Sequence, residues 1–248
     1  SWFAMLFSAG VGIGLLFFGV LEPVYYNFSE GGAARPLGID ATQPGNEYIG
    51  IVGTIHHWGL EGWAIYAAVG LSLAIFCYNL NLPLTLRSAF YPILGERVWG
   101  WWGHAIDTLA VFATLFGLTT SLGLGARQVA AGLNEVAGIE PTNTVTVLLI
   151  IGITAIALVS VLLGMDKGVK RLSEINMIMA VGLFIFVLFM SGVGTALSRY
   201  FSVMVDYVVH LPALSNPFGR DDTSYFHGWT TFYWAWWIAW SPFVGMFI

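Results

Sequence analysis

The chain has 248 residues, of which 57% are hydrophobic and 9% charged, and its formal net charge is -5. With a mean hydropathy of +0.77, this composition excludes an ordinary soluble globular domain and predicts an all-α integral membrane protein. The small dispersed charge offers no basic run for nucleic acid. The single cysteine, Cys77, excludes an internal disulfide and a cysteine-based metal site.

Six apolar stretches are long enough to cross a bilayer as helices, which takes about 20 residues. They lie near residues 2–27, 48–79, 103–133, 143–164, 175–197 and 229–248. The chain begins and ends inside such stretches and has no initiator methionine, so we expect a piece of a longer protein. We interpret residues 1–248 as a single transmembrane domain.

Lysines and arginines are concentrated in two of the predicted loops, residues 80–101 and 164–172. The positive-inside rule places these two loops in the cytoplasm. The alternate loops, residues 28–47, 134–142 and 198–228, then face outside. We expect a multi-pass protein of the cell inner membrane.

The first predicted span contains three alternating glycines, Gly10, Gly12 and Gly14, in the stretch GVGIG. Each costs a helix about 1 kcal/mol relative to alanine. The spacing of four between Gly10 and Gly14 fits close packing against another helix. The additional Gly12 instead favours a backbone that unwinds and offers carbonyl groups to an ion or a ligand. At the outer end of this span, Glu22 is interpreted as an interfacial acid, although an intramembrane position would make it functional.

Aromatic residues share one side of the second predicted span in the stretch HHWGLEGWAIYAA. Trp58, Trp63 and Tyr66 fall within an arc of about 140° of a helix. Aromatic residues near helix ends commonly form an interfacial belt. A set that shares one face fits better to a cage, in which the negative ring faces hold a quaternary ammonium group.

Three histidines suggest an alternative from another class, a redox membrane enzyme that holds haem or a metal. They are His56 and His57 in the second span and His104 in the third. The sequence offers them no further ligand at a useful spacing, and it contains no phosphate loop or metal-ligand motif. The sequence therefore disfavours this alternative.

Polar residues recur every four positions between the fifth and sixth spans, at Ser198, Ser202, Asp206 and His210. A narrow polar stripe on an otherwise apolar helix predicts a helix that lies in the membrane interface. It serves either as an ordinary connector or in a contact between subunits.

The last span contains the stretch FYWAWWIAWSPFVG, in which Trp236, Trp237 and Trp240 fall within an arc of about 100°. Pro242 follows directly, removes a backbone donor and is expected to break the helix. Two broken helices, here and at the glycines of the first span, are typical of secondary transporters with inverted repeats, which bind substrate and ions at the breaks.

Four stretches of the sequence carry a family resemblance that runs along essentially the whole chain. GVGIG, HHWGLEGWAIYA, ATLFG with SLGLGARQ, and FYWAWWIAWSPFVGMF resemble, in that order, the betaine/choline/carnitine transporter family. The resemblance implies a leucine-transporter-type fold of two inverted five-helix repeats, with the chain covering family spans three to eight. It also implies a homotrimer in the lipid bilayer.

The resemblance assigns a substrate site to the two aromatic sets and the glycines. A cage for the trimethylammonium group comprises Trp58, Trp63, Tyr66 and Trp237, and Trp236 and Trp240 line the access path. The backbone of Gly10, Gly12 and Gly14 contacts the substrate carboxylate. Members specialised for choline tend to carry an acid where Gly14 stands, so this residue favours a zwitterion.

The resemblance also assigns residues to sodium, the coupling ion, and implies no other cofactor. These residues are Ser8, Val11, Thr114, Thr119 and Phe243. Leu118 departs from the family pattern, which places a second threonine there, and Thr119 is the available substitute.

The function that the resemblance implies is secondary active transport, not enzymatic chemistry. The substrate is a quaternary-ammonium or sulfonium zwitterion such as glycine betaine, taken up by sodium-coupled symport with alternating access. Dimethylsulfoniopropionate and ectoine also suit an aromatic cage. The alternative is a sodium-independent exchanger or a proton-coupled carrier for substrates of the choline or carnitine type.

Overall fold

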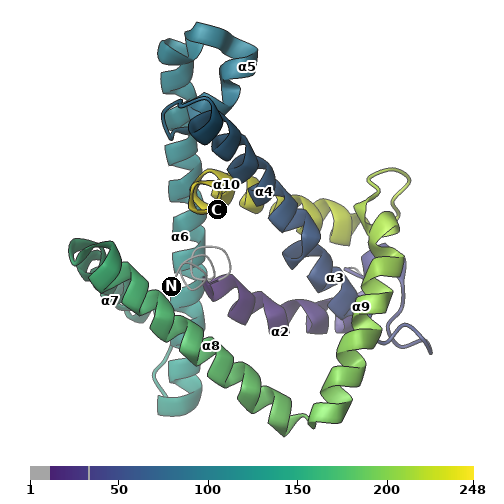
Figure 1. The fold of residues 1–248 in the computed structure, drawn as a ribbon. Coiled ribbons are helices and arrows are strands. Elements are labelled where there is room, and N and C mark those ends of the chain that lie inside the picture. The colour runs from purple at the N-terminus through teal and green to yellow at the C-terminus, as the bar shows by residue number, and fades with distance from the viewer. Residues whose placement is uncertain (1–11, 33) are drawn as a thin grey trace. The chain divides into compact units, whose positions relative to one another are not determined.

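The structure, a computed structural model, describes residues 12–32 and 34–248 (Figure 1). These residues form helices and turns, and no strand occurs among them. The α-helices are α2 (Gly12–Phe28), α3 (Ile49–Trp58), α4 (Leu60–Ala74), α5 (Tyr91–Leu94), α6 (Trp101–Ala137), α7 (Asn143–Leu162), α8 (Lys170–Met190), α9 (Val193–Ser215) and α10 (Thr231–Phe247). Shorter 3-10 or π-helical turns are η1 (Glu30–Gly32), η2 (Pro36–Gly38), η3 (Ile75–Asn79), η4 (Leu86–Phe90), η5 (Gly95–Trp99), η6 (Met165–Val169) and η7 (Ser224–Thr230).

Four helical segments within the described residues are long and apolar enough to cross a bilayer. They are Ile49–Asn79, Trp101–Ala137, Asn143–Leu162 and Lys167–Met190. The all-helical, membrane-compatible architecture predicted from the sequence is thereby confirmed for these four. The first and last predicted spans correspond to α2 and α10, each with 17 described residues.

The described chain divides into two compact units. One comprises the described residues up to Gly19 together with Thr119–Arg199, and the other comprises Val20–Leu118 and Tyr200–Ile248. In the first unit, α7 begins at the N-cap Thr142, whose side chain accepts a hydrogen bond from the Val145 backbone N–H at 3.3 Å. Such a cap satisfies one of the donors that a helix leaves open at its start.

The second unit has a core built from α2, α3, α9 and η7. Its buried residues are Tyr26, Ala34, Ile49, Val52, Val203, Tyr207, Leu214 and Tyr225. The predicted helix over residues 198–210 is confirmed as part of α9, which buries Val203 and Tyr207 on one side. Asp206 and His210 of its polar stripe line a small pocket next to the start of α3.

A buried arginine joins the loops of the second unit. The Arg220 guanidinium pairs with Asp222 at 2.5 Å and donates to the carbonyl oxygens of Ala213 and Leu214, at the end of α9. Asp222 also accepts the backbone N–H of Leu37 at 2.7 Å. This ion pair therefore fastens the loop after α2 to the segment that leads into α10.

Small residues allow α10 to pack closely on α4. A Cβ atom on Gly245 would lie 2.6 Å from Val69 Cγ1, and one on Gly70 would lie 3.2 Å from Ile248 Cβ. Helices in membranes associate through such close packing because lipid is as apolar as their side chains. The glycine at 245 thus serves as a contact surface.

The predicted break at Pro242 does not occur, because α10 continues from Thr231 to Phe247 with Pro242 inside it. Proline cannot donate to the carbonyl four residues earlier, that of Ile238. The Ser241 hydroxyl donates to this oxygen instead, at 2.8 Å. Serine side chains can replace a missing backbone donor in apolar surroundings, so the helix tolerates its proline.

The described helix is interrupted instead at Gly59, between α3 and α4. Gly59 has φ -96° and ψ -130°, outside the helical region, and its N–H bonds to Ile55 O at 2.7 Å. A Cβ atom there would lie 2.5 Å from Ile55 O. Glycine is the residue that allows this close backbone approach. Gly12 and Gly14 are helical residues of α2, and Gly10 lies outside the described residues.

Candidate functional site

Five aromatic side chains from α3, α4 and α10 pack together beside the break at Gly59. We call Trp58, Tyr66, Tyr233, Trp236 and Trp237 the aromatic cluster. The ring of Trp237 is central: its centroid is 4.9 Å from Trp58, 5.9 Å from Tyr66 and 5.6 Å from Tyr233. Trp236 stacks on it at 5.3 Å with an interplanar angle of 5°. The structure therefore brings together residues that are about 170 positions apart in the sequence.

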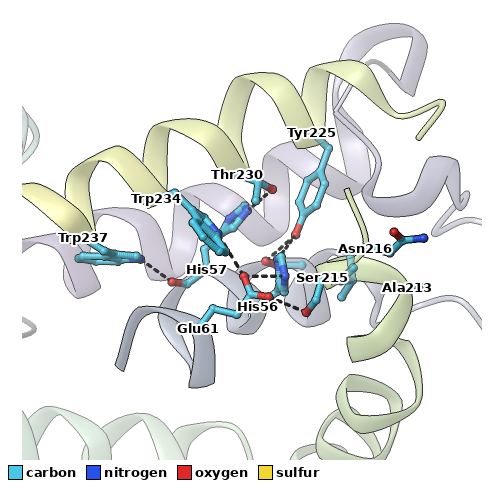
Figure 2. A network of polar contacts seen from close by, with 12 residues as sticks. His56, His57, Glu61, Ala213, Ser215, Asn216, Tyr225, Thr230, Trp234 and Trp237 are labelled. Atoms are coloured by element: carbon cyan, nitrogen blue, oxygen red, sulfur yellow. Dashed lines mark hydrogen bonds and ion pairs between the residues drawn. The ribbon is translucent and has the colours of Figure 1, made fainter. Parts of the chain in front are cut away.

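Hydrogen bonding fixes the indole of Trp237. Its Nε1 donates to the carbonyl oxygen of His57 at 2.8 Å (Figure 2). This carbonyl belongs to the last turn of α3, where carbonyl groups have no partner within the helix. The helix break thus supplies an acceptor for the indole, and the indole satisfies a carbonyl that lipid could not.

Ring geometry decides which faces a ligand can use. A quaternary ammonium group binds over an aromatic face, within about 6 Å of the ring centroid. The parallel stack of Trp236 and Trp237 covers one face of each ring, and Trp58 meets Trp237 at 76°. Trp58 is half-buried. Tyr233 also stacks on Trp236 and Trp237, and these three rings are at most 6% exposed, so a cation on their faces requires the cluster to open.

Two of the predicted site tryptophans lie at the margin of this arrangement. Trp63 packs edge to face on Tyr66 at 5.7 Å and is half-buried. Trp240 faces α6, where a Cβ atom on Gly117 would lie 3.2 Å from its Cδ1, and its ring is 5.5 Å from Phe243. Trp240 therefore marks a contact between α10 and α6.

A buried carboxylate, that of Glu22, lies directly behind the aromatic cluster. Its Oε1 accepts from Trp58 Nε1 at 2.7 Å and from the hydroxyl of Tyr233. Its Oε2 accepts from the Tyr26 hydroxyl at 2.7 Å and lies 3.0 Å from His57 Nδ1. Glu22 is 0% exposed, so its carboxylate is buried inside the protein.

The two histidines of α3 serve different polar groups. His57 Nε2 lies 2.9 Å from the Thr230 hydroxyl (Figure 2). The His57 ring stacks on Tyr225 and on Tyr233. His56 Nδ1 lies 3.3 Å from the Tyr225 hydroxyl. On another helix, His104 Nδ1 lies 3.2 Å from an Arg87 nitrogen. His56 and His57 thus share Tyr225 as a neighbour, whereas His104 pairs with Arg87.

Glu61, at the start of α4, joins three further elements. It lies 3.1 Å from His56 Nε2 and accepts hydrogen bonds from Ser215 of α9 at 2.5 Å and from Trp234 Nε1 at 3.2 Å (Figure 2). The carboxylate sits two residues after Gly59. The end of α9 and the first half of α10 are therefore tied to the helix break.

Of the predicted sodium residues, the structure describes Thr114, Thr119 and Phe243. Thr114 donates its hydroxyl to Ala110 O at 2.9 Å, which leaves the oxygen lone pairs for a cation. Thr114 lies one turn before Gly117, at the contact of α6 with Trp240, whose neighbour is Phe243. Thr119 follows five residues after Thr114 on α6, about 140° around the helix. A regular helix does not turn both hydroxyls to one ion.

Other predicted residues lie outside the described part of the chain. They are Ser8, Gly10 and Val11. Gly14 is buried within the first turns of α2.

Sequence reasoning left the role of Glu22 open and did not single out Tyr233. The signal for Glu22 was an acid beside a proline in an apolar span, which by itself is equally typical of a span end. Tyr233 comes just before the tryptophans of α10, but its role depends on a carboxylate 211 residues earlier. Only the fold brings these two residues together.

Comparison with known proteins gives the context for this geometry. A family model described as betaine/carnitine/choline family transporter matches residues 1–248. A glycine betaine/proline/choline transporter of Vibrio parahaemolyticus is 54% identical over 260 residues, covering 100% of this chain and 47% of the relative. A glycine betaine transporter of Acinetobacter baylyi is 46% identical over 249 residues, with 100% and 37% covered. The high-affinity choline transport protein of Escherichia coli is 43% identical over 252 residues, with 100% and 36% covered.

The chain thus spans about half, or less, of the length of the curated relatives it matches. The matched family and these relatives are transporters rather than enzymes. With an all-helical structure, four helices long and apolar enough to cross a bilayer among its described residues, and a match along residues 1–248, the chain belongs to the betaine/carnitine/choline family of membrane transporters.

Proposed function

We propose that the full-length protein takes up a quaternary-ammonium zwitterion, glycine betaine or a close analogue, by sodium-coupled symport. The observation that carries this proposal is the packing of Trp58, Tyr66 and Trp237 across three helices at a backbone break. Aromatic faces suit a trimethylammonium group because it has no N–H to donate and is attracted by the ring quadrupole. Two of the relatives named above are described as transporters of glycine betaine.

Alternating access is proposed to operate at this same break. In transporters with inverted repeats, substrate and ions bind where spanning helices are discontinuous. Gly59 supplies a discontinuity directly after Trp58. A leucine-transporter-type fold, in which this chain forms the first repeat and the start of the second, is part of the proposal.

Sodium coupling is proposed with one ion near Ser8 and Val11 and a second near Thr114 and Phe243. The second site is the weaker part, because Leu118 replaces a threonine and Thr119 lies on another side of α6. The proposal therefore requires at least one sodium ion for each substrate molecule.

We propose that the full-length protein lies in the inner membrane and forms a homotrimer. α9 leaves an apolar side exposed that includes Phe201 (64%), Val205 (63%) and Val209 (67%). Lipid or another subunit can cover such a surface.

Uptake of radiolabelled glycine betaine tests the proposal, with the full-length protein in cells that lack their own osmolyte carriers. We expect uptake that falls at least tenfold when sodium is replaced by potassium. Trp237→Ala should reduce uptake at least tenfold through a higher KM, because it removes the central ring and leaves His57 O without a donor.

Trp101→Ala is the matched control, since Trp101 is 71% exposed and lies outside the aromatic cluster. It should leave uptake within twofold of the wild type. Uptake that is indifferent to sodium but is abolished by an uncoupler would indicate a proton-coupled carrier. Uptake that is indifferent to both, and accelerated by internal substrate, would indicate an exchanger.

A further inference from the structure

Glu22 is a fully buried acid with no basic side chain other than histidine as a partner. It is 0% exposed, and among the residues that the structure describes its ion-pair partner is His57, with no lysine or arginine. A buried charge is costly unless hydrogen bonds stabilise it. The donors that surround Glu22 therefore decide its charge state.

Four donors converge on the two carboxylate oxygens. They are the Tyr26 hydroxyl, His57 Nδ1, Trp58 Nε1 and the Tyr233 hydroxyl. An ionised carboxylate only accepts hydrogen bonds, whereas a protonated one must direct its own hydrogen at an acceptor. The indole can only donate, and both tyrosine hydroxyls and His57 Nδ1 can do so, so the arrangement suits an ionised carboxylate.

A neutral His57 satisfies the two contacts that its ring nitrogens make with Glu22 and Thr230. With Nδ1–H donating to Glu22, Nε2 accepts from the Thr230 hydroxyl at 2.9 Å. Thr230 is 4% exposed, and among the described contacts its hydroxyl has His57 Nε2 as its acceptor. A second proton on His57 would leave that hydroxyl without an acceptor. Glu22 thus keeps its net negative charge.

We propose that Glu22 is a specificity-determining residue, a fixed counter-charge that makes the aromatic cluster select a positively charged headgroup over an uncharged group of the same shape. This inference rests on the proposed function of the cluster and names what the cluster recognises. Glu22 acts through Trp58 and Tyr233, both hydrogen-bonded to its Oε1.

The effect follows from electrostatics in an apolar site. A negative charge one hydrogen bond behind a ring adds to the negative potential of the ring face, and a low local dielectric preserves this contribution. The two rings bonded to Oε1 of Glu22, those of Trp58 and Tyr233, also contact Trp237. A trimethylammonium group on these faces gains from the charge, whereas a tert-butyl group fills the same volume without that gain.

Uptake kinetics of the full-length protein test the proposal with glycine betaine and its uncharged-headgroup isostere, 3,3-dimethylbutanoate, as competitor. For Glu22→Gln we expect the KM for glycine betaine to rise at least tenfold, with Vmax within threefold after correction for protein in the membrane. The inhibition constant of the isostere should stay the same or fall. If the isostere inhibits uptake by neither the wild type nor Glu22→Gln, the test rests on whether the variant raises KM for glycine betaine while leaving Vmax within threefold.

Glu96→Gln is the matched control, because it neutralises an exposed acid that is bonded to Tyr91 and lies outside the aromatic cluster. It should keep KM within threefold. An unchanged KM in Glu22→Gln, or an equal loss for betaine and isostere, would overturn the proposal, as would a comparable rise in Glu96→Gln.

If Glu22→Gln does not reach the membrane, the wild type decides. Glycine betaine should then bind at least tenfold more tightly than the isostere, and equal affinities would overturn the proposal. Absence of any betaine uptake by the wild type would instead contradict the proposed function, so the two failures are distinguishable.

Discussion

At the residue scale, Gly62 lies where the indole of Trp237 comes closest to α4. A Cβ atom added to Gly62 would be 3.0 Å from Trp237 Nε1 and 3.1 Å from its Cδ1. The same Nε1 donates to His57 O. A methyl group at residue 62 would therefore displace the Trp237 ring and disturb its hydrogen bond to His57 O.

Gly62→Ala should raise the KM for glycine betaine about tenfold, since overpacking of this kind costs about 1–3 kcal/mol. Gly123→Ala is the control, because a Cβ atom there meets nothing within 4 Å, and alanine favours helix. Uptake kinetics of both variants, normalised to protein in the membrane, provide the measurement. Equal kinetics in the two variants would contradict the described packing of Trp237 on α4.

The residues that carry the site differ in how far the sequence could predict them. Trp58, Trp237 and Tyr66 were predictable because helical periodicity places them on one face and their chemistry is specific. Glu22 was not, because its burial depends on Tyr233, 211 residues away. Periodicity reports which side of a helix a residue occupies, but not what another helix brings to that side.

At the element scale, α10 shows how neighbouring residues offset a local defect. Pro242 deprives Ile238 O of its helical donor, and the Ser241 hydroxyl takes that place. The sequence predicted helix boundaries well where apolar periodicity is long, as in α6 and α7. The sequence predicted a break at Pro242 because only the missing backbone donor was considered, and not the hydroxyl of the neighbouring Ser241.

A double-mutant cycle on α10 checks this compensation. Ser241→Ala should destabilise the protein by about 0.6 kcal/mol, the average for hydrogen bonds inside membranes, and by up to about 1.7 kcal/mol. In a Pro242→Ala background the same change should cost close to nothing, because residue 242 then donates to Ile238 O itself. Denaturant unfolding in mild detergent measures all four proteins. Equal costs in the two backgrounds would show that the serine has no compensating role.

At the scale of the whole molecule, the family match covers residues 1–248 and the relatives are longer than this chain. Sequence composition alone was sufficient to predict a membrane protein, because four described helices are far more apolar than a soluble domain tolerates. The break at Gly59 was not predicted, since glycines within apolar helices also serve in close packing.

The orientation of the chain is testable by cysteine labelling of the full-length protein with its native cysteines replaced. By the positive-inside rule, Gln43→Cys should react with a membrane-impermeant maleimide from outside the cell. Ile93→Cys, at a position 78% exposed in a loop predicted to be cytoplasmic, should react only after permeabilisation. The reverse pattern would invert the proposed topology.

The hydrogen bond from Trp237 to His57 O has a mechanical consequence. The indole that we propose to contact the substrate also occupies a carbonyl at the end of α3. Separating α10 from α3 would leave that oxygen without a donor in apolar surroundings, which costs several kcal/mol. A transport cycle must therefore either carry α3 and α10 as one body or provide the oxygen with a replacement donor. Water that enters as the site opens can be that donor, so opening of the site and its hydration would be coupled.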